Sequence, residues 1–348
     1  MSDRKLRVGV VGANFGAAVH VPAYRAQGRF EVVALASPAS AARVAKERKI
    51  PHAFASVDEM LAGVELDVVS VASPPFAHRH DVLAALAHGK HVLCEKPFAL
   101  DVAQAEELVA AAKSAGTVCA LAHEFRYTPA RNAVRELIEN GHLGPLREIE
   151  VTFLGGMLRA SGTRPNSWWF ERARGGGLTG AFASHLVDLS NFLAGRAPLR
   201  ATGFERTANP RRTVDGVTFT SDVADGAFAL IDYGDGLIGR VTADGTRAVS
   251  ALTVAAHGEL RSVASTGADL VAATTFTIDE EETAELELRP AAHAILASVH
   301  PNLPPFVSLL DEFANAIDGK SAEYPTFADG LETQRVLAAI GYGAALRT

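Results

Sequence analysis

Hydrophobic residues in the first third of the chain form short, nearly continuous runs that alternate with longer stretches of helical periodicity. Continuous apolar runs of this length are typical of strands buried on both faces of a parallel sheet. Their regular alternation with helices predicts a doubly wound parallel sheet, an α/β Rossmann domain, over residues 1–122. The predicted strands are residues 6–11, 31–36, 67–72, 91–94 and 118–122, and the predicted helices are residues 17–27, 40–48, 56–62, 77–88 and 103–114.

After residue 122 the pattern changes to short β-rich runs framed by helices. Asp-Gly pairs separate many of these runs, as expected for the turns between antiparallel strands. This pattern predicts a second domain, residues 123–348, of the α+β class with a large, mostly antiparallel open sheet. Its predicted helices are residues 129–140, 179–194, 305–317 and 327–346, and its clearest predicted strands are residues 146–154, 226–232, 236–242 and 251–256.

Composition and charge narrow the class of protein. A chain of 348 residues exceeds a comfortable single core, which agrees with two domains. The net charge of -7 argues against nucleic acid or an anionic membrane surface as the main partner. No apolar run reaches the roughly 20 residues that cross a bilayer, and the first residues lack an apolar signal segment, so we expect a cytoplasmic protein. Cys94 and Cys119 lie in apolar runs and are expected to be reduced core residues, and no residues show metal-ligand spacing.

A glycine-rich turn follows the first predicted strand. In the G-x-G-x-x-G/A fingerprint of dinucleotide-binding folds, the first glycine makes the tight turn, the second admits the pyrophosphate, and the third lets helix and strand pack closely. Gly12, Asn14 and Ala17 occupy those places, and Gly16 adds backbone freedom one position early. Asn tolerates left-handed backbone better than most residues. We predict that a dinucleotide contacts Gly12, Asn14, Phe15 and Gly16.

The end of the second predicted strand bears on the choice of nicotinamide nucleotide. A carboxylate there would bind the ribose 2′-hydroxyl and repel a 2′-phosphate. Residues 36–40 contain no acid, and Ser37 is followed by Arg43 and Lys46. Hydroxyls and a basic helix start slightly favour NADP over NAD, with Ser37 and Arg43 as cofactor-binding residues, although a solvated helix face also explains Arg43.

Residues 89–97 place Lys96 at the carboxyl end of a predicted strand, between a carboxylate and a proline. Open α/β sheets bind ligands at this end of their strands. Hydride transfer develops charge on the substrate oxygen, which a positioned cation or acid stabilises. We therefore predict Lys96 as a catalytic residue that also lies near the cofactor. The other predicted cofactor-binding residues here are Ser73, Pro74, His78 and Glu95.

The second predicted domain contributes further candidates. His185 and Asp188 are three residues apart in a predicted helix and share one face. We predict His185 as a second proton-moving catalytic residue, while Asp188 binds substrate or holds the helix or the imidazole. His123 and Arg126 follow the last Rossmann strand and are predicted to bind substrate, with anchoring of the interdomain loop as the alternative for Arg126. Trp168 is a candidate for stacking on a sugar ring, and packing in the core or at a subunit interface is its alternative.

Several segments resemble motifs of the Gfo/Idh/MocA family, which takes its name from glucose-fructose oxidoreductase, inositol dehydrogenase and a rhizopine-catabolism protein. Residues 84–97 are similar to its A-L-x-x-G-K-H-V-x-x-E-K-P signature, and residues 175–188 to its G-G-G-x-x-x-D-x-G-x-H-x-x-D segment. The resemblance covers the whole chain. The other similar segments are Gly12-x-Asn14-x-x-Ala17-x-x-His20 in the glycine loop, residues 73–78 after the third strand, residues 123–129 at the domain junction, and residues 324–327 near the end.

The resemblance implies a Rossmann domain, then an open α+β domain, with the substrate in the cleft between them. It implies that Lys96 lies near the nicotinamide and the substrate oxygen, that the Lys96-Pro97 peptide is often cis, and that His185 donates or accepts a proton. Ala181 and Ala183 stand where the family has Asp and Gly, so the family's arrangement of Lys, Asp and His is incomplete in this sequence. Pro75 likewise stands where the family has Asn.

These observations predict an NAD(P)-dependent oxidoreductase that transfers hydride between nicotinamide and a hydroxyl or ketone of a sugar, polyol or related small molecule. Two alternatives remain on the same fold. One is a non-catalytic nucleotide-binding sensor, which Ala181 would suit, and the other is a redox-assisted glycosidase that keeps its NAD bound. The resemblance also implies a homodimer or homotetramer, with pairing through a face of the sheet in the second domain.

Overall fold

The computed structural model describes residues 4–160, 164–267, 275–278 and 293–343. Contacts divide the chain into two compact units, which are described separately. The first unit comprises Met1–Ala99, Ala103–Glu124 and Ala292–Leu331, and the second comprises Leu100–Val102, Phe125–Ala291 and Glu332–Thr348. The sequence-based domain boundary at residue 122 remains a prediction. Contacts also assign residues 292–331, which that prediction gives to the second domain, to the first unit.

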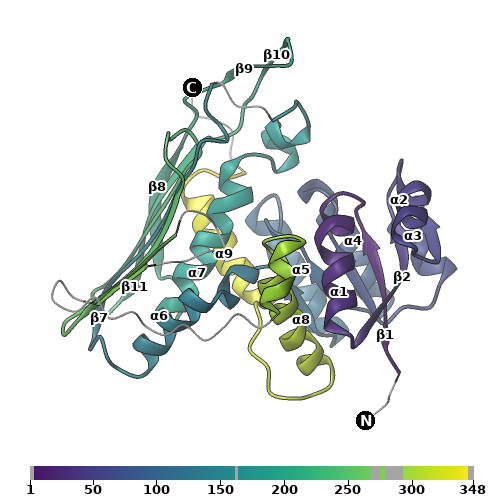
Figure 1. The fold of residues 1–348 in the computed structure, drawn as a ribbon, viewed down its shortest axis with the longest axis horizontal. Helices are drawn as coiled ribbons and strands as arrows, with labels where there is room; N and C mark the ends of the chain where they lie inside the picture. Colours follow the sequence, from purple (N-terminus) through teal and green to yellow (C-terminus); the bar gives the residue numbers. More distant parts are fainter. Residues whose placement is uncertain (1–3, 161–163, 268–274, 279–292, 344–348) are drawn as a thin grey trace. The chain divides into compact units, whose positions relative to one another are not determined.

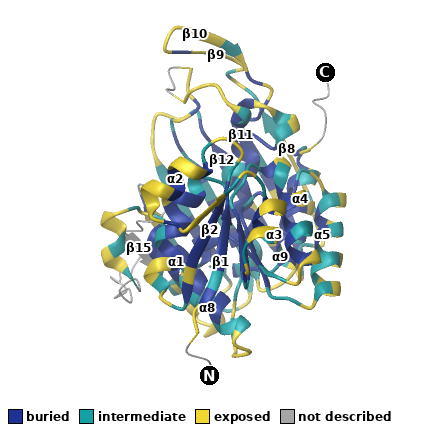
Figure 2. Ribbon diagram, turned by 90° about the vertical axis from the view of Figure 1, so that its right-hand side faces the viewer, coloured by how far each residue is buried: buried dark blue, intermediate teal, exposed yellow. Residues whose placement is uncertain are grey.

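The first unit is built on a parallel sheet of six strands in the order β3-β2-β1-β4-β5-β6. This order, with helices between the strands, confirms the predicted doubly wound Rossmann class. The strands β1 and β2 are buried, as the apolar runs predict (Figure 2). The strands are β1 (Leu6–Val11), β2 (Phe30–Ala36), β3 (His52–Phe54), β4 (Val68–Val71), β5 (His91–Cys94) and β6 (Cys119–Leu121).

The helices of this unit follow the predicted periodicity, with small shifts at their ends. A π-helical turn, η1 (Gly16–His20), leads directly into α1, which packs against β2 and against α8 from the distant end of the chain. Cys94 and Cys119 are free and buried, in agreement with the prediction of core thiols. The helices are α1 (Val21–Gln27), α2 (Ala41–Arg48), α3 (Val57–Gly63), α4 (Pro75–Ala87), α5 (Val102–Ala115), η6 (Ala294–Ser298) and α8 (Leu303–Ile317).

The second unit is built on a mixed sheet of seven strands in the order β15-β14-β13-β7-β12-β11-β8. The central pair, β7 and β12, is parallel, and the other neighbouring strands are antiparallel. The predicted α+β class with a mostly antiparallel sheet is therefore confirmed. The strands are β7 (Leu146–Leu154), β8 (Arg200–Arg206), β11 (Gly226–Gly234), β12 (Leu237–Asp244), β13 (Ala251–Gly258), β14 (Ser262–Gly267) and β15 (Thr275–Ile278), and a separate hairpin contains β9 (Arg211–Val214) and β10 (Val217–Thr220).

Alternation along these strands gives the sheet one buried face and one face of intermediate to high exposure. Ile149, Val151 and Phe153 of β7 point into the core together with Ala229 and Ile231 of β11. Helices α6 (Pro129–Glu139) and α7 (Ser184–Ala194) cover this face (Figure 1). The opposite face carries the alternate residues, which include Phe204, Leu230 and Ile238.

The last predicted helix is shorter than expected. Helix α9 spans Phe327–Ala339, so the prediction of helix as far as residue 346 is wrong for residues 340–343. Gly341 and Gly343 have φ values of 114° and 81°, which a helix does not accept. Residue 346 lies outside the described residues. In the described parts of the chain, no helix combines the length and apolar character that a membrane span requires.

Candidate functional site

The glycine loop lies between β1 and η1 in the first unit. Gly12 has a φ of 110°, and a Cβ atom there would lie 2.2 Å from the carbonyl oxygen of Ala72, so only glycine fits this turn. A Cβ atom on Gly16 would lie 2.9 Å from Cγ1 of Val10. The close approach of helix and strand therefore occurs at Gly16, one position before Ala17, where the fingerprint places it. Asn14 is exposed and Phe15 is half-buried.

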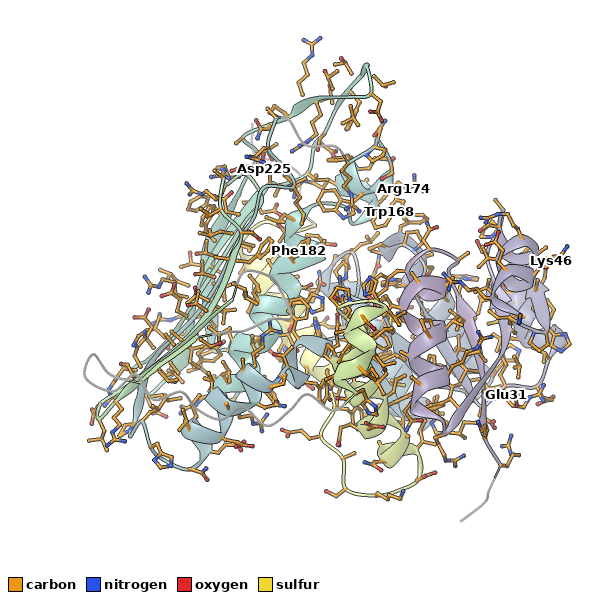
Figure 3. All side chains as sticks on the ribbon, in the orientation of Figure 1. Glu31, Lys46, Trp168, Arg174, Phe182 and Asp225 are labelled. Carbon is orange, nitrogen blue, oxygen red and sulfur yellow. The ribbon has the colours of Figure 1, made fainter. Side chains whose placement is uncertain are left out.

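The end of β2 presents two hydroxyl groups and no carboxylate. Ser37 Oγ lies 3.1 Å from Ser40 Oγ. Arg43 is exposed and forms an ion pair with Glu47, one turn further along α2, at 2.8 Å. Lys46 projects from α2 into solvent (Figure 3).

The segment after β4 is tied to the segment that carries Lys96. Ser73 donates a hydrogen bond from Oγ to Asp81 at 2.6 Å. The ring of His78 is wholly buried, with Nε2 2.8 Å from the carbonyl oxygen of Ser73 and Nδ1 3.0 Å from that of Pro97. Burial lowers the pKa of His78, despite its contacts with these acceptors. This placement favours a positioning role for His78 over direct contact with a dinucleotide.

Lys96 lies two residues after the last residue of β5, and its peptide bond to Pro97 is cis, as the resemblance implies. The Lys96 side chain is 18% exposed, and Nζ lies 4.0 Å from Oε2 of Glu95. Glu95 is buried and turned inward, where His20 approaches its other oxygen at 3.1 Å. Glu95 therefore lies behind Lys96 rather than on the surface of the unit.

The second unit places His185 in the first turn of α7. Its ring is buried and stacks on the ring of Phe125, with centroids 3.9 Å apart and planes within 10°. The guanidinium of Arg131 lies 4.7 Å from the centroid of the same Phe125 ring and donates a hydrogen bond to the Phe125 carbonyl oxygen at 2.9 Å. Since Phe125 is held from its backbone and its ring, the His185 imidazole has a fixed orientation.

Arg126 and Asp188, both predicted to bind substrate, bind each other. Arg126 donates from Nε to Oδ2 of Asp188 at 2.8 Å and from its terminal nitrogen to Oδ1 at 2.5 Å. Their side chains are 7% and 2% exposed. This bidentate pair joins the short helix η2 (Glu124–Tyr127) to α7. The substrate-binding roles of both residues remain predictions.

Trp168 and His123 belong to different units, and their roles in substrate binding remain predictions. Trp168 begins the short helix η3 (Trp168–Phe170), is half-buried and packs against the core of the second unit (Figure 3). His123 is buried in the first unit, two residues after the end of β6. Ala181 lies in the π-helical turn η5 (Thr179–Ala183), which precedes α7.

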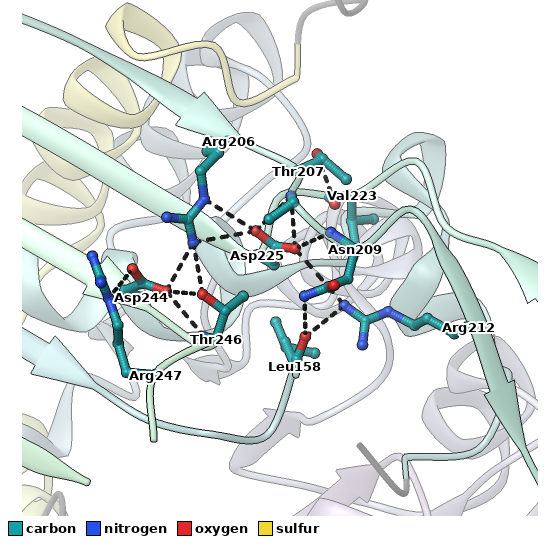
Figure 4. Close-up of polar contacts among 11 residues, drawn as sticks. Leu158, Arg206, Thr207, Asn209, Arg212, Val223, Asp225, Asp244, Thr246 and Arg247 are labelled. Carbon is teal, nitrogen blue, oxygen red and sulfur yellow. Dashed lines mark hydrogen bonds and ion pairs between the residues drawn. The ribbon is translucent and has the colours of Figure 1, made fainter. Parts of the chain in front are cut away.

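A separate network of buried charges lies at the ends of β11 and β12 (Figure 4). Asp244 accepts hydrogen bonds from Arg206 at 2.9 Å and from the Thr246 hydroxyl at 2.7 Å. Burial alone would raise the pKa of Asp244, but these donors lower it to about 2. Asp225 accepts hydrogen bonds from the backbone of residues 208 and 209. The donors of this network serve to hold the ends of the strands, so it is a structural feature.

Three features of the site were not visible in the sequence. These are the contact of His20 with Glu95 and Ser70, the stacking of Phe125 on His185, and the ion pair of Arg126 with Asp188. The spacing of His20 after the glycine loop was the only signal for any of them. Among the described residues, no group of three or more His, Cys, Asp or Glu is arranged to hold a metal ion.

Family models match most of the chain. Residues 6–123 match a model described as an oxidoreductase family with an NAD-binding Rossmann fold, and residues 132–284 match the Gfo/Idh/MocA C-terminal domain. The chain belongs to the Gfo/Idh/MocA oxidoreductase family. The family resemblance that the sequence motifs predict is thereby confirmed, and the first unit carries an NAD-binding fold.

Individual relatives are similar to this chain at moderate identity and over only part of its length. An uncharacterized oxidoreductase of Synechocystis sp. is 39% identical over 194 residues, which cover 55% of this chain but only 52% of that protein. A levoglucosan dehydrogenase of Pseudarthrobacter phenanthrenivorans is 27% identical over 265 residues, 69% of this chain and 67% of the relative. A 1,5-anhydro-D-fructose reductase of Ensifer adhaerens is 33% identical over 230 residues, 62% of this chain and 67% of the relative.

A solved structure extends the comparison to nearly the whole chain. The NAD binding oxidoreductase from Klebsiella pneumoniae has a TM-score of 0.82 and 25% identity, and the match covers 97% of this chain and 96% of that one. The fold of this chain is therefore similar to that of a solved oxidoreductase over nearly its whole length.

Proposed function

We propose that this protein is an NAD(P)-dependent oxidoreductase that transfers hydride between nicotinamide and a hydroxyl or ketone carbon of a small sugar or polyol. The observation that carries the proposal is a half-buried lysine, Lys96, at the carboxyl end of β5 in an NAD-binding fold whose turn accepts only glycine at position 12. The names of two relatives, a levoglucosan dehydrogenase and a 1,5-anhydro-D-fructose reductase, support a sugar as substrate.

The proposed chemistry assigns one task to each polar group. The nicotinamide, when bound, supplies or accepts the hydride. During carbonyl reduction the Lys96 ammonium stabilises the negative charge that develops on the substrate oxygen and donates a proton to it. His185, whose ring Phe125 orients, is proposed as a second group that donates or accepts a proton. In the direction of alcohol oxidation the same groups accept the one proton that the hydroxyl releases.

We further infer a preference for NADP over NAD from the end of β2. Ser37 and Ser40 offer hydroxyl donors, and no carboxylate in residues 36–40 would repel a 2′-phosphate. Arg43 is paired with Glu47, but both side chains are exposed, and exposed ion pairs of this kind contribute less than about 1 kcal/mol. Arg43 can therefore exchange Glu47 for a phosphate at little cost.

The first experiment measures oxidation of NADPH and NADH against a panel of keto-sugars, together with the Kd of each nucleotide. We expect stoichiometric NADPH oxidation with at least one sugar. Arg43→Ala should raise the Kd of NADPH about tenfold because a charged hydrogen bond is lost, and should leave that of NADH unchanged. Lys113→Ala, an exposed substitution on α5, is the control.

The outcomes separate the proposed function from its alternatives. Nucleotide binding without oxidation of any sugar would indicate a sensor. Cleavage of a glycoside with bound NAD and no net consumption would indicate a redox-assisted glycosidase. Equal Kd values for NADH and NADPH, unaffected by Arg43→Ala, would contradict the preference for NADP alone.

We also propose that the chain forms a homodimer or homotetramer through the outer face of the large sheet. Phe204, Leu230 and Ile238 are 60%, 51% and 39% exposed there, and Phe204 contacts the ring of Phe228. A terminal nitrogen of Arg240, on the same face, lies 2.7 Å from a carboxylate oxygen of Glu148 and 2.7 Å from one of Glu150. A second copy of the chain can complement this mixture of charges.

Leu230→Glu should convert this oligomer into a monomer, because it buries an unpaired charge in the interface. Sedimentation velocity measures the mass of each species. Val217→Glu, at an equally exposed apolar position in the β9–β10 hairpin, should leave the mass unchanged. A monomeric wild-type chain would refute this proposal.

A further inference from the structure

A chain of hydrogen bonds runs through the interior of the first unit and ends at Lys96. The ring of His20, in η1, has Nδ1 2.7 Å from Ser70 Oγ and Nε2 3.1 Å from Glu95 Oε1. The other oxygen of Glu95, Oε2, accepts a hydrogen bond from the backbone N–H of Lys96 at 3.2 Å and lies 4.0 Å from its Nζ. His20 and Ser70 are 0% exposed and Glu95 is 6% exposed.

The chemistry of these groups fixes the direction of each bond. An ionised carboxylate can only accept, so Nε2–H of His20 donates to Glu95, and Nδ1 of the neutral imidazole accepts the hydrogen of the Ser70 hydroxyl. The ring of His20 lies against two phenylalanine rings. The distance between ring centroids is 4.6 Å to Phe306 of α8 and 5.7 Å to Phe15 of the glycine loop. Ser70 and the two rings thereby hold the imidazole in one orientation.

The charges around Glu95 come from three elements. Lys96 lies beside it, His20 approaches from η1, and His78 faces it from α4. Burial alone would raise the pKa of Glu95, but the hydrogen bond from His20 and the charge of Lys96 bring it below its usual value. Two further groups face this region: Asp81, which accepts the Ser73 hydroxyl, and Cys94, whose pKa burial raises well above its usual value.

We propose that His20, oriented by Ser70, is a positioning residue that keeps the Glu95 carboxylate directed at Lys96. The inference rests on the proposed role of Lys96 and assigns Glu95 a task that does not require contact with the cofactor. Without His20 the carboxylate loses the donor that holds its Oε1, so its Oε2 is no longer fixed 4.0 Å from Nζ of Lys96. The Lys96 ammonium then lacks its neighbouring negative charge and releases its proton at a lower pH.

The test follows the pH dependence of Lys96 modification by a small amine-reactive reagent, measured by peptide mass spectrometry on the full chain without substrate or nucleotide. In His20→Leu the midpoint of the modification curve should fall by about one pH unit, as for a cation that loses a neighbouring anion. Glu95→Gln should give the same fall. The double variant should give no further fall, because His20 acts through Glu95.

His20→Gln is the conservative variant. Its side-chain amide can place a donor near the position of Nε2, so the midpoint should stay close to that of the wild type. His142→Asn, an exposed histidine of the second unit, is the control for loss of a histidine. A midpoint that does not move in His20→Leu, or a fall that persists on top of Glu95→Gln, would overturn the proposal. If His20→Leu does not fold, an unchanged midpoint in Glu95→Gln overturns it, and a fall that Ser70→Ala reproduces in part supports it.

The modification experiment on Lys96 tests this inference separately from the proposed function, because modification requires no enzymatic turnover. A chain that oxidises no NADPH with any sugar can still show the shifted midpoint, in which case only the proposed function fails. Where the wild type is active, the alkaline limb of its kcat/KM profile for sugar reduction should move in His20→Leu by the same amount as the labelling curve. A kinetic limb that stays in place while labelling shifts would contradict a role of this carboxylate in the reaction.

Discussion

Replacing Lys96 with alanine is expected to lower kcat for sugar reduction by roughly 10²–10⁴-fold, the usual contribution of one general acid. The ammonium lies at the end of β5 beside the Glu95 carboxylate, and alanine removes both its charge and its proton. The Kd of NADPH should change little, because the glycine loop and the end of β2 are separate from Lys96 in the sequence and in the sheet. Stopped-flow turnover and calorimetric titration of NADPH measure the two quantities independently.

Lys96→Arg sharpens this experiment. Arginine keeps the positive charge but does not release a proton in proteins, so kcat should stay low if proton transfer is the task of Lys96. Recovery of kcat in Lys96→Arg would show that charge alone is required. Lys113→Ala should leave kcat as in the wild type. Undiminished turnover in Lys96→Ala would remove the residue from the mechanism.

Local patterns explain why most of the fold was predictable. The strands β1, β2, β4 and β5 are covered on both faces, so their continuous apolar runs identify them. Strand β3 has two exposed residues and one half-buried residue, and for that reason it carries no such signal. The return of α8 to pack against α1 depends on contacts between distant segments, such as the hydrogen bond from Gln27 to Asp311, which no local periodicity encodes.

The same distinction divides the candidate site. Gly12 and Lys96 were found because each belongs to a contiguous motif whose chemistry follows from neighbouring residues. The contacts between distant residues were not predicted. His20 and Glu95 are 75 residues apart in the sequence, and Arg126 and Asp188 are 62 residues apart. Sequence reasoning assigned Glu95 to the cofactor and Arg126 and Asp188 to the substrate. The structure shows Glu95 in contact with His20, and Arg126 in contact with Asp188.

Breaking the Arg126–Asp188 pair is expected to have the largest effect on stability. Asp188→Ala should lower the free energy of unfolding of the second unit by about 3–5 kcal/mol, because it leaves a buried guanidinium without its bidentate partner. Trp168 and Trp169 are the two tryptophans of the chain, and both belong to this unit, so tryptophan fluorescence during urea unfolding reports on it specifically.

Two further variants identify the cause of that loss. Glu171→Ala removes an ion pair with Arg174 in which the Glu171 side chain is 53% exposed and the Arg174 side chain 42%. This substitution should lower the free energy of unfolding by less than about 1 kcal/mol. Replacing both members in Arg126→Met/Asp188→Leu should recover much of the stability, since the cost arises from the unpaired buried charge rather than from the loss of the attraction. A loss in Asp188→Ala no greater than that in Glu171→Ala would mean that water or another group compensates Arg126. The pair would then not be what fixes η2 against α7, the helix whose first turn carries His185.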